Sequence, residues 1–271
     1  MAAGKTIPRM VRTIETGFLL DAVIAVGAAA GVSVSAWRLG ALSRSGAVAG
    51  TIVGATVFGF GGFSAALVLV LFFVSSSALS LLPPAGERSA RGARQVLANG
   101  SVAAVAAAAM GWTPEASVAL LGAVGAATAD TWATEIGVRL GKTPRSILTL
   151  RRQAPGTSGA VSFPGTAAAA AGALAVAGVG YRLISGATAN GLVAVAIAGL
   201  LGSIVDSLLG AAVQARYHCP ACGATPEVAR HGGCEVRAER ISGVPGLDND
   251  AVNLLATVTG AAAALVTCGA I

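Results

Sequence analysis

The chain has 271 residues, of which 55% are hydrophobic and 11% are charged. Soluble domains carry about 25% charged residues, so the composition excludes a soluble globular protein and predicts an all-α, polytopic transmembrane helical bundle. Its 37 glycines suit close packing of helices in lipid. The net charge of +6 lies mostly in short loops, where it indicates topology, and we expect no nucleic-acid partner.

Eight segments are apolar and long enough, or nearly long enough, to form membrane helices. We expect these helices at residues 16–36, 45–60, 63–82, 96–112, 116–139, 160–181, 188–213 and 250–269. They form one integral-membrane domain, residues 1–271, with a small polar insertion at 216–246 between the last two helices. The basic N-terminus resembles a signal peptide, but its apolar part extends to about Trp37, which favours a first transmembrane helix.

The second expected helix is interrupted by Gly59, Gly61 and Gly62. Residues 45–82 form either one long kinked helix, which lowers the total to about seven, or two short helices. A single helix of 38 residues would overshoot a bilayer core about 30 Å thick. We therefore expect two helices here.

Basic residues gather in four of the connecting loops. They are Arg38 and Arg44; Arg88, Arg91 and Arg94; Arg139, Lys142, Arg145, Arg151 and Arg152; and Arg216, Arg230, Arg237 and Arg240. An even number of expected helices separates each basic loop from the next, so all of these loops can face the cytoplasm. We expect a multi-pass protein of the cell membrane with both termini outside, a placement that the basic N-terminus opposes.

The motif ADTWATEIG, residues 129–137, places polar groups late in an apolar span. A carboxylate inside a membrane span is costly, so Asp130 and Glu135 indicate a functional site. On a helix, Thr131, Thr134 and both carboxylates fall within an arc of about 140°. Four other segments carry polar residues at similar depth: Asn99; Gly156, Thr157, Ser158 and Gly159; Ser203, Asp206 and Ser207; and Asp250 and Asn253. Such convergence predicts one site between helices, facing the cytoplasm.

Carboxylates at one depth repel one another unless a cation or protons join them. Oxygen ligands with no histidine nearby suit Mg²⁺, so we expect Asp130, Glu135 and Asp206 to be catalytic metal ligands. The glycine-rich turn at 156–159, at the expected start of a helix, offers backbone N–H groups to an anion. The basic loop adds arginines that we expect to bind a nucleotide: Arg145, Arg151 and Arg152. These features predict a phosphoryl-transfer site, although no Walker A motif is present.

Each of these features also has another interpretation. The same carboxylates suit a cation- or proton-coupled transporter, or a purely structural buried role. The segment 155–166 alone reads as a flexible loop, and the basic loop alone as a topology determinant. Asn99 equally suits a bridge between two helices.

The polar insertion contains a cluster of metal-ligand residues. Cys219 and Cys222 form a C-x2-C pair, which His231 and Cys234 follow. Three cysteines and one histidine form a standard tetrahedral zinc set, so we expect structural Zn²⁺ that holds this loop. A disulfide or redox pair is the alternative, which a cytoplasmic loop disfavours. A site closed by four ligands leaves no position for catalysis.

Five motifs occur in the chain in a fixed order: RQVLANG (94–100), ADTWATEIG (129–137), PGTSGAVSFPGT (155–166), GSIVDSLLGA (202–211) and LDNDAVN (247–253). In these motifs the chain resembles the domain-of-unknown-function-92 family of integral membrane proteins. That family includes transmembrane protein 19 and the plant phytyl-phosphate kinase, and many prokaryotic members carry a similar Cys/His insertion. The resemblance covers roughly residues 40–265.

The resemblance implies transfer of a phosphoryl group from a nucleoside triphosphate, CTP by family expectation, to an isoprenyl monophosphate held in the bilayer. By position, it gives the three carboxylates to Mg²⁺ and the turn at 156–158 to phosphate. Residues that would complete the pocket are Asn99, Asp250 and Asn253, with Thr131, Thr134, Ser203 and Ser207 beside the carboxylates. Family members often read Gly-Thr-Asn-Gly-Gly where this chain has Gly-Thr-Ser-Gly-Ala at 156–160, so the prenyl substrate stays open.

Overall fold

The computed structural model describes residues 9–82, 90–184, 189–223, 234 and 236–269. The predicted all-α fold is confirmed. The helices are α1 (Arg9–Arg38), α2 (Arg44–Ser80), α3 (Ala93–Ala109), α4 (Ala116–Leu140), α5 (Phe163–Val176), α6 (Arg182–Ile184), α7 (Ala189–Ala212) and α8 (Asn249–Gly269), with a π-helical stretch at Ala177–Tyr181 between α5 and α6. Two short antiparallel pairs complete the fold: β1 (Arg145–Ser146) with β2 (Ala160–Val161), and β3 (Arg216–His218) with β4 (Glu239–Ser242).

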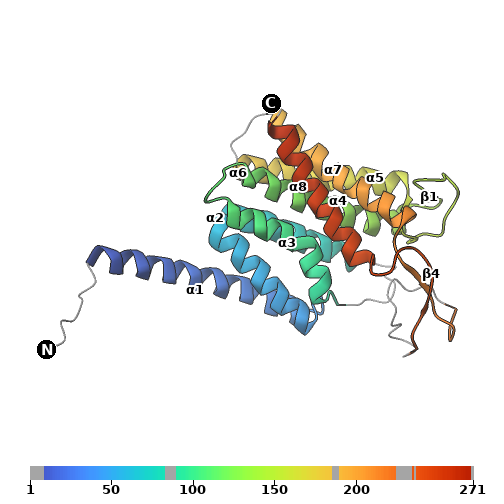
Figure 1. Ribbon diagram of the computed structural model, residues 1–271, viewed down its shortest axis with the longest axis horizontal. Helices are drawn as coiled ribbons and strands as arrows, with labels where there is room; N and C mark the ends of the chain where they lie inside the picture. The colour runs from blue at the N-terminus through green and yellow to red at the C-terminus, as the bar shows by residue number, and fades with distance from the viewer. Residues whose placement is uncertain (1–8, 83–89, 185–188, 224–233, 235, 270–271) are drawn as a thin grey trace.

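Helix α4 lies at the centre of the bundle, between α3, α5, α7 and α8 (Figure 1). Every residue from Ala116 to Ala129 is buried, and the polar motif follows directly, at Asp130. A helix that is apolar on all sides is either enclosed by other helices or faces lipid, and the burial of this stretch shows that other helices enclose it. The first half of α4 is therefore core, and its second half carries the polar residues toward the loops.

Small residues bring the backbones of these helices into contact. A Cβ atom at Gly122 of α4 would clash with the carbonyl oxygen of Gly260 in α8, and one at Gly260 would clash with the carbonyl of Gly122. Toward α7, a Cβ at Gly125 would lie 3.4 Å from the Cα of Gly199. Close approach through small residues is how helices associate when lipid supplies no hydrophobic driving force between them.

Helix α2 folds back on itself at Gly62, whose φ of 74° breaks the helical backbone. A straight helix of 37 residues would be about 55 Å long. Yet both ends of α2 meet Arg91. The N–H of Ser43, the N-cap residue of α2, donates to the Arg91 carbonyl, and the Arg91 guanidinium donates to the hydroxyl of Ser77 near the other end. The reversal lies within the glycine segment where the sequence predicts a break between two helices.

Helix α1 packs along the first half of α2 and extends away from the remaining helices (Figure 1). Its small side chains fit glycines spaced four apart in α2: Ser33 lies against Gly50 and Ala29 against Gly54. Among the described side chains of α1, most of the large apolar ones, such as Leu19 and Val23, are exposed. An apolar surface of this kind suits contact with lipid.

Five of the described helices are long and apolar enough to cross a membrane: Leu19–Arg38, Arg44–Ser80, Phe163–Ile184, Ala189–Ala212 and Asn249–Gly269. The chain is thus an integral membrane protein with several candidate spans. Helices α3 and α4 are not in this set, although the sequence predicts spans at 96–112 and 116–139. Because α4 is enclosed by its neighbours, it needs little lipid-facing apolar surface.

The basic loops meet at one end of the bundle, as their even spacing along the chain predicts. Arg91 joins the second loop to the first through Ser43. Arg139 reaches the carbonyl of Leu82, which joins the third loop to the second. Arg216 donates to the carbonyl of Ser158, which joins the fourth loop to the third.

We expect Gly122→Ala to lower stability by roughly 1–3 kcal/mol, because the new methyl group meets backbone that cannot move away. Thermal unfolding in detergent micelles measures the effect. Gly31→Ala is the matched control, since its Cβ would have nothing within 4 Å. The control should be neutral or slightly stabilising, and equal losses for both variants would contradict the packing described here.

Candidate functional site

A cavity of about 1050 Å³ opens among α1, α2, α3, α4, α7 and the loop between β1 and β2. Most of the site residues predicted from sequence line its wall. They are Asn99, Asp130, Thr131, Thr134, Glu135, Gly156, Thr157, Ser158, Gly159, Ser203, Asp206, Ser207 and Asn253. Segments far apart in the sequence therefore meet at one place, although their chemical roles remain predictions.

Four predicted site residues lie outside this wall. Arg145, Arg151 and Arg152 are exposed, and the Arg145 guanidinium donates a hydrogen bond of 2.8 Å to the carbonyl of Leu150. Asp250 instead faces Arg94, with 3.7 Å between its carboxylate oxygen and the arginine Nε. Arg94 also pairs with Asp248 at 2.6 Å, so these groups tie the start of α3 to the start of α8.

The donor set around Asp130 and Asp206 consists of oxygen and amide groups. Neutral polar side chains from four helices line the same cavity as the two carboxylates: Asn99, Thr131, Thr134, Ser203, Ser207 and Asn253. None of the described residues that line the cavity is histidine or cysteine. A site with this composition suits a hard divalent cation such as Mg²⁺ rather than a softer metal.

Glu135 is held by neighbours of its own. Its Oε2 lies 2.6 Å from Nη1 of Arg139, one helical turn further on, and its Oε1 accepts a hydrogen bond from Ser80. The Arg139 guanidinium also donates to the carbonyl of Leu82, at 2.6 Å from Nη2. The sequence groups Glu135 with the metal ligands, but this ion pair favours a role in positioning Arg139.

Sequence reasoning missed Arg91 as a site residue. Its guanidinium lines the cavity and donates hydrogen bonds to Ser77 at 3.0 Å and to Ser80 at 3.3 Å. Burial lowers its pKa, and the charge of Glu135 partly opposes that change. The signal in the sequence was the run SSSALS at 75–80, which is unusually rich in hydroxyl groups for an apolar helix.

The turn at 155–160 is anchored to the end of α7. Gln214 donates to the hydroxyl of Ser158 at 3.1 Å, and Arg216 donates to the carbonyl of Ser158 at 3.1 Å. Gly159 packs so closely on α7 that a Cβ would clash with the backbone nitrogen of Ala211. Ser158 is therefore fixed by protein contacts, and its hydroxyl is engaged by a neighbouring amide.

The expected helix start at residue 160 is wrong. Helix α5 begins at Phe163, where Ser162 caps it by accepting from the N–H of Gly165 at 3.3 Å, and Pro164 sets the first turn. Strand β2 lies between the glycine-rich turn and this helix. The dipole of α5 would favour an anion at the first turn of this helix. The glycine-rich segment at 155–160 lies before that helical turn.

The cavity continues from its polar end into an apolar groove. Its lining residues on α2 include Phe63, beside the Gly62 reversal, and Ser77 and Ser80, at the loop end. Phe63 and Ser77 are separated by 14 residues, or roughly 21 Å of helix. The groove is thus about two thirds as long as the hydrocarbon core of a bilayer is thick, which is about 30 Å.

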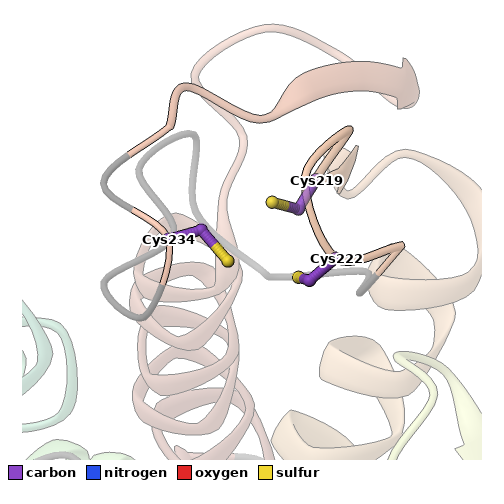
Figure 2. A group of neighbouring side chains, drawn as sticks. All are labelled: Cys219, Cys222 and Cys234. Atoms are coloured by element: carbon purple, nitrogen blue, oxygen red, sulfur yellow. The ribbon is translucent and has the colours of Figure 1, made fainter.

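The three described cysteines of the insertion form a cluster that can bind a metal. The sulfur atoms of Cys219, Cys222 and Cys234 all lie within 4.8 Å of one another and point into the space between them (Figure 2). Thiolates around a tetrahedral zinc ion lie about 3.8 Å apart, given Zn–S bonds of about 2.3 Å. The predicted fourth ligand, His231, lies outside the described residues.

The neighbouring thiols disfavour ionisation of Cys234. Hydrogen bonding between Cys234 and Cys222, followed by burial and by interactions with Cys219, raises the pKa of Cys234 to about 11. A metal ion would reverse this effect, because it stabilises thiolates directly.

A family model described as "Integral membrane protein DUF92" matches residues 27–261. Protein PGR of Arabidopsis thaliana is 30% identical over 278 residues, covering 89% of this chain and 94% of that protein. An uncharacterised membrane protein of Methanocaldococcus jannaschii is 27% identical, covering 81% of this chain and 82% of the relative. One from a Synechocystis strain is 29% identical, covering 61% and 69%. No solved structure matches.

We expect Gly159→Ala to destabilise the cavity wall more than Gly156→Ala does. Both glycines have positive φ, at 74° and 82°, so both substitutions carry a similar backbone strain. Only Gly159 is packed against α7, whereas a Cβ at Gly156 would come no closer than 3.9 Å to Val138. Thermal midpoints in detergent compare the two, and a midpoint for Gly159→Ala at or above that of Gly156→Ala would contradict the anchoring of this turn.

Proposed function

Because the chain belongs to the DUF92 family of integral membrane proteins, we propose that it is a membrane-embedded phosphotransferase. Its substrate is an isoprenyl monophosphate of the phytyl or geranylgeranyl type, and its product is the lipid diphosphate. The donor is a nucleoside triphosphate, with CTP as the expectation from the family resemblance, and Mg²⁺ is the cofactor. The reaction takes place at the cytoplasmic face of the cell membrane.

One observation carries the proposal: a single cavity joins carboxylates and arginines to a long apolar groove. Transport of an ion or a proton does not require an apolar groove. A lipid phosphate, in contrast, requires polar groups for its phosphate and an apolar groove for its hydrocarbon chain. The volume of about 1050 Å³ lies just above the usual range for small-molecule sites, about 300–1,000 Å³. This combination favours a lipid kinase over the cation- or proton-coupled transporter.

Asp130 and Asp206 would hold Mg²⁺, which neutralises charge on the phosphates of the donor. Amide and hydroxyl groups around them, including Asn99 and Asn253, orient the phosphate oxygens by hydrogen bonds. Since α4 is rigidly enclosed, Asp130 is held in place before substrate arrives. Such preorganisation is the main source of rate in phosphoryl transfer.

The chemical step needs little acid–base catalysis, because the acceptor phosphate is already an anion. An oxygen of the lipid monophosphate bonds to the terminal phosphorus of the donor. The bond from that phosphorus to its bridging oxygen breaks, and the nucleoside diphosphate leaves. The protein's task is to align the two phosphates and to offset their mutual repulsion.

The donor would approach from the loop side of the cavity. Pro144, Ile147 and the turn at 155–160 line this side, and the exposed Arg151 and Arg152 belong to the same loop. We assign these arginines, with Arg145, to attracting the nucleotide rather than to the wall of the cavity. Such contacts with solvent-exposed charges raise the rate of association and weaken as salt increases.

The cysteine cluster would hold structural Zn²⁺, with His231 as the fourth ligand. Strands β3 and β4 flank the cluster. Beside them, the N–H of Ala215, just before β3, donates to the carbonyl of Leu247, just before α8, at 2.8 Å. Arg216 in β3 also supports Ser158 at the cavity wall. Metal binding would therefore stabilise the loop end of the site without taking part in the reaction.

Asp130→Asn and Asp206→Asn should each lower the rate of lipid diphosphate formation by about 100-fold or more, because each removes charge that would hold the metal. Purified protein with radiolabelled CTP, Mg²⁺ and phytyl or geranylgeranyl phosphate provides the assay. Asp250→Asn is the matched control, as Asp250 lies outside the cavity wall, and it should keep most activity. If folded wild-type protein forms no lipid diphosphate from any nucleotide, the proposed function is wrong.

Purified protein should contain about one zinc ion per chain, which elemental analysis measures. Cys219→Ser and Cys222→Ser should lose this zinc and lower the thermal midpoint, since the loop loses its cross-link. Cys268→Ser is the control, because Cys268 lies in α8 outside the cluster. Wild-type protein without bound metal, or equal zinc loss in the Cys268 variant, would rule out this site.

A further inference from the structure

Building on the proposed function, we propose that Arg91 binds the phosphate of the acceptor lipid, whose hydrocarbon chain lies along the second half of α2. Among the described residues, the cations that line the cavity are Arg91 and Arg139. Arg139 forms an ion pair, whereas the described hydrogen-bond partners of the Arg91 side chain are neutral, and this difference suggests different roles for the two arginines.

Arg139 already has an anionic partner, whereas the described hydrogen bonds of the Arg91 side chain go to neutral groups. Arg139 pairs with Glu135 at 2.6 Å, and Arg91 donates to the hydroxyls of Ser77 and Ser80. A half-buried guanidinium is costly unless an anion compensates it. The nearby Glu135 is already paired with Arg139, so Arg91 is a cation at the cavity wall whose described side-chain hydrogen bonds engage no anion.

The local charges add to the same conclusion. Arg91 and Arg139 contribute two positive charges and Glu135 contributes one negative charge, which leaves a net charge of +1 in this cluster. A phosphate monoester brings one or two negative charges and acceptor oxygens that match the planar fork of arginine. The hydroxyl of Ser77 can rotate to donate to the same oxygens, whereas the hydroxyl of Ser80 already donates to Glu135.

The backbone of Arg91 is fixed in place, so the guanidinium is presented from a rigid support. Its N–H donates to the carbonyl of Ala41 at 3.1 Å, and its carbonyl accepts from the N–H of Ser43 at 3.1 Å. The carbonyl also packs directly on Gly46, where a Cβ atom would clash with it. These contacts hold Arg91 against the start of α2, at the loop end of the cavity.

The second half of α2 presents one face that changes from apolar to polar toward Arg91. Seven of its cavity-lining residues fall within an arc of about 140° around the helix, with Leu69 and Phe72 beside that arc: Phe63, Ala66, Leu67, Val70, Phe73, Ser77 and Ser80. This spacing places them on one side of the helix. A ligand with an apolar chain beside Phe63–Phe73 and an acidic head at Ser77 and Ser80 fits this face, and the head then meets Arg91.

The test measures binding without nucleotide or Mg²⁺, using geranylgeranyl monophosphate and geranylgeraniol with purified protein in detergent. Arg91→Gln should weaken monophosphate binding about 10- to 100-fold, the loss expected for hydrogen bonds to a charged group, and should leave binding of the alcohol unchanged. Arg91→Lys should recover part of the affinity, because it restores the charge without the planar fork. Arg94→Gln is the matched control, since Arg94 is exposed, pairs with Asp248 and lies outside the cavity wall.

The remaining outcomes separate this inference from its alternatives. Wild-type monophosphate binding by Arg91→Gln overturns it, and so does an equal loss for the alcohol, which would indicate a structural role. A loss for CTP but not for the lipid monophosphate would assign Arg91 to the donor and overturn it as well. Inorganic phosphate should compete only weakly, because it has no chain, and affinity equal to that of the lipid would exclude an amphiphilic ligand.

The same measurements distinguish failure of this inference from failure of the proposed function. Protein that binds the lipid monophosphate through Arg91 but never forms a diphosphate supports the binding site and rejects the kinase. Conversely, an Arg91→Gln variant that makes diphosphate at the wild-type rate under limiting lipid substrate supports the kinase and rejects this assignment.

Discussion

The enclosure of α4 is the constraint on which the rest of the structure depends. Its first half is buried on every side, so α7 and α8 must approach it within backbone distance, and glycines at 122, 125, 199 and 260 permit this. A helix so tightly held cannot turn its polar end toward lipid. Asp130, Thr131, Thr134 and Glu135 therefore line a cavity walled by neighbouring helices.

The reversal of α2 at Gly62 gives that cavity its second character. Because both ends of α2 return to Arg91, the second half of the helix runs from the C-terminal end of α3, where Gly61 lies near Ala107 and Met110, to the basic loops. One face of it carries aromatic and aliphatic groups and then hydroxyls. Polar groups from α3, α4, α7 and α8 line the cavity together with the hydroxyl end of this face. The site is therefore polar near these hydroxyl groups and apolar along the rest of the groove.

The sequence predicts the bundle and most of the cavity wall because both rest on strong, local signals. Apolar runs locate helices, the glycines at 59–62 mark the reversal, and the basic loops locate one end of the bundle. Side-chain pairing depends instead on distances between helices, which no local pattern encodes. Asp250 therefore turned out to face Arg94, and Arg91 went unnoticed as a wall residue. The start of α5 at Phe163 could have been predicted from the sequence, since Ser162 and Pro164 form a helix-start signal.

The pairing of Glu135 resolves a conflict within the polar motif of α4. Asp130 and Glu135 lie about 140° apart around the helix and about 7.5 Å apart along it, too far apart to share one metal without distortion. Glu135 and Arg139 are four residues apart and only about 40° around the helix, the spacing at which opposite charges pair best. The charged residues of α4 therefore form two groups along the helix, with Asp130 further from the loops and the Glu135–Arg139 ion pair nearer to them. Asp130 serves the interior, where Asp206 and the amides of Asn99 and Asn253 line the same cavity, and Glu135 fixes the arginine nearest the loops.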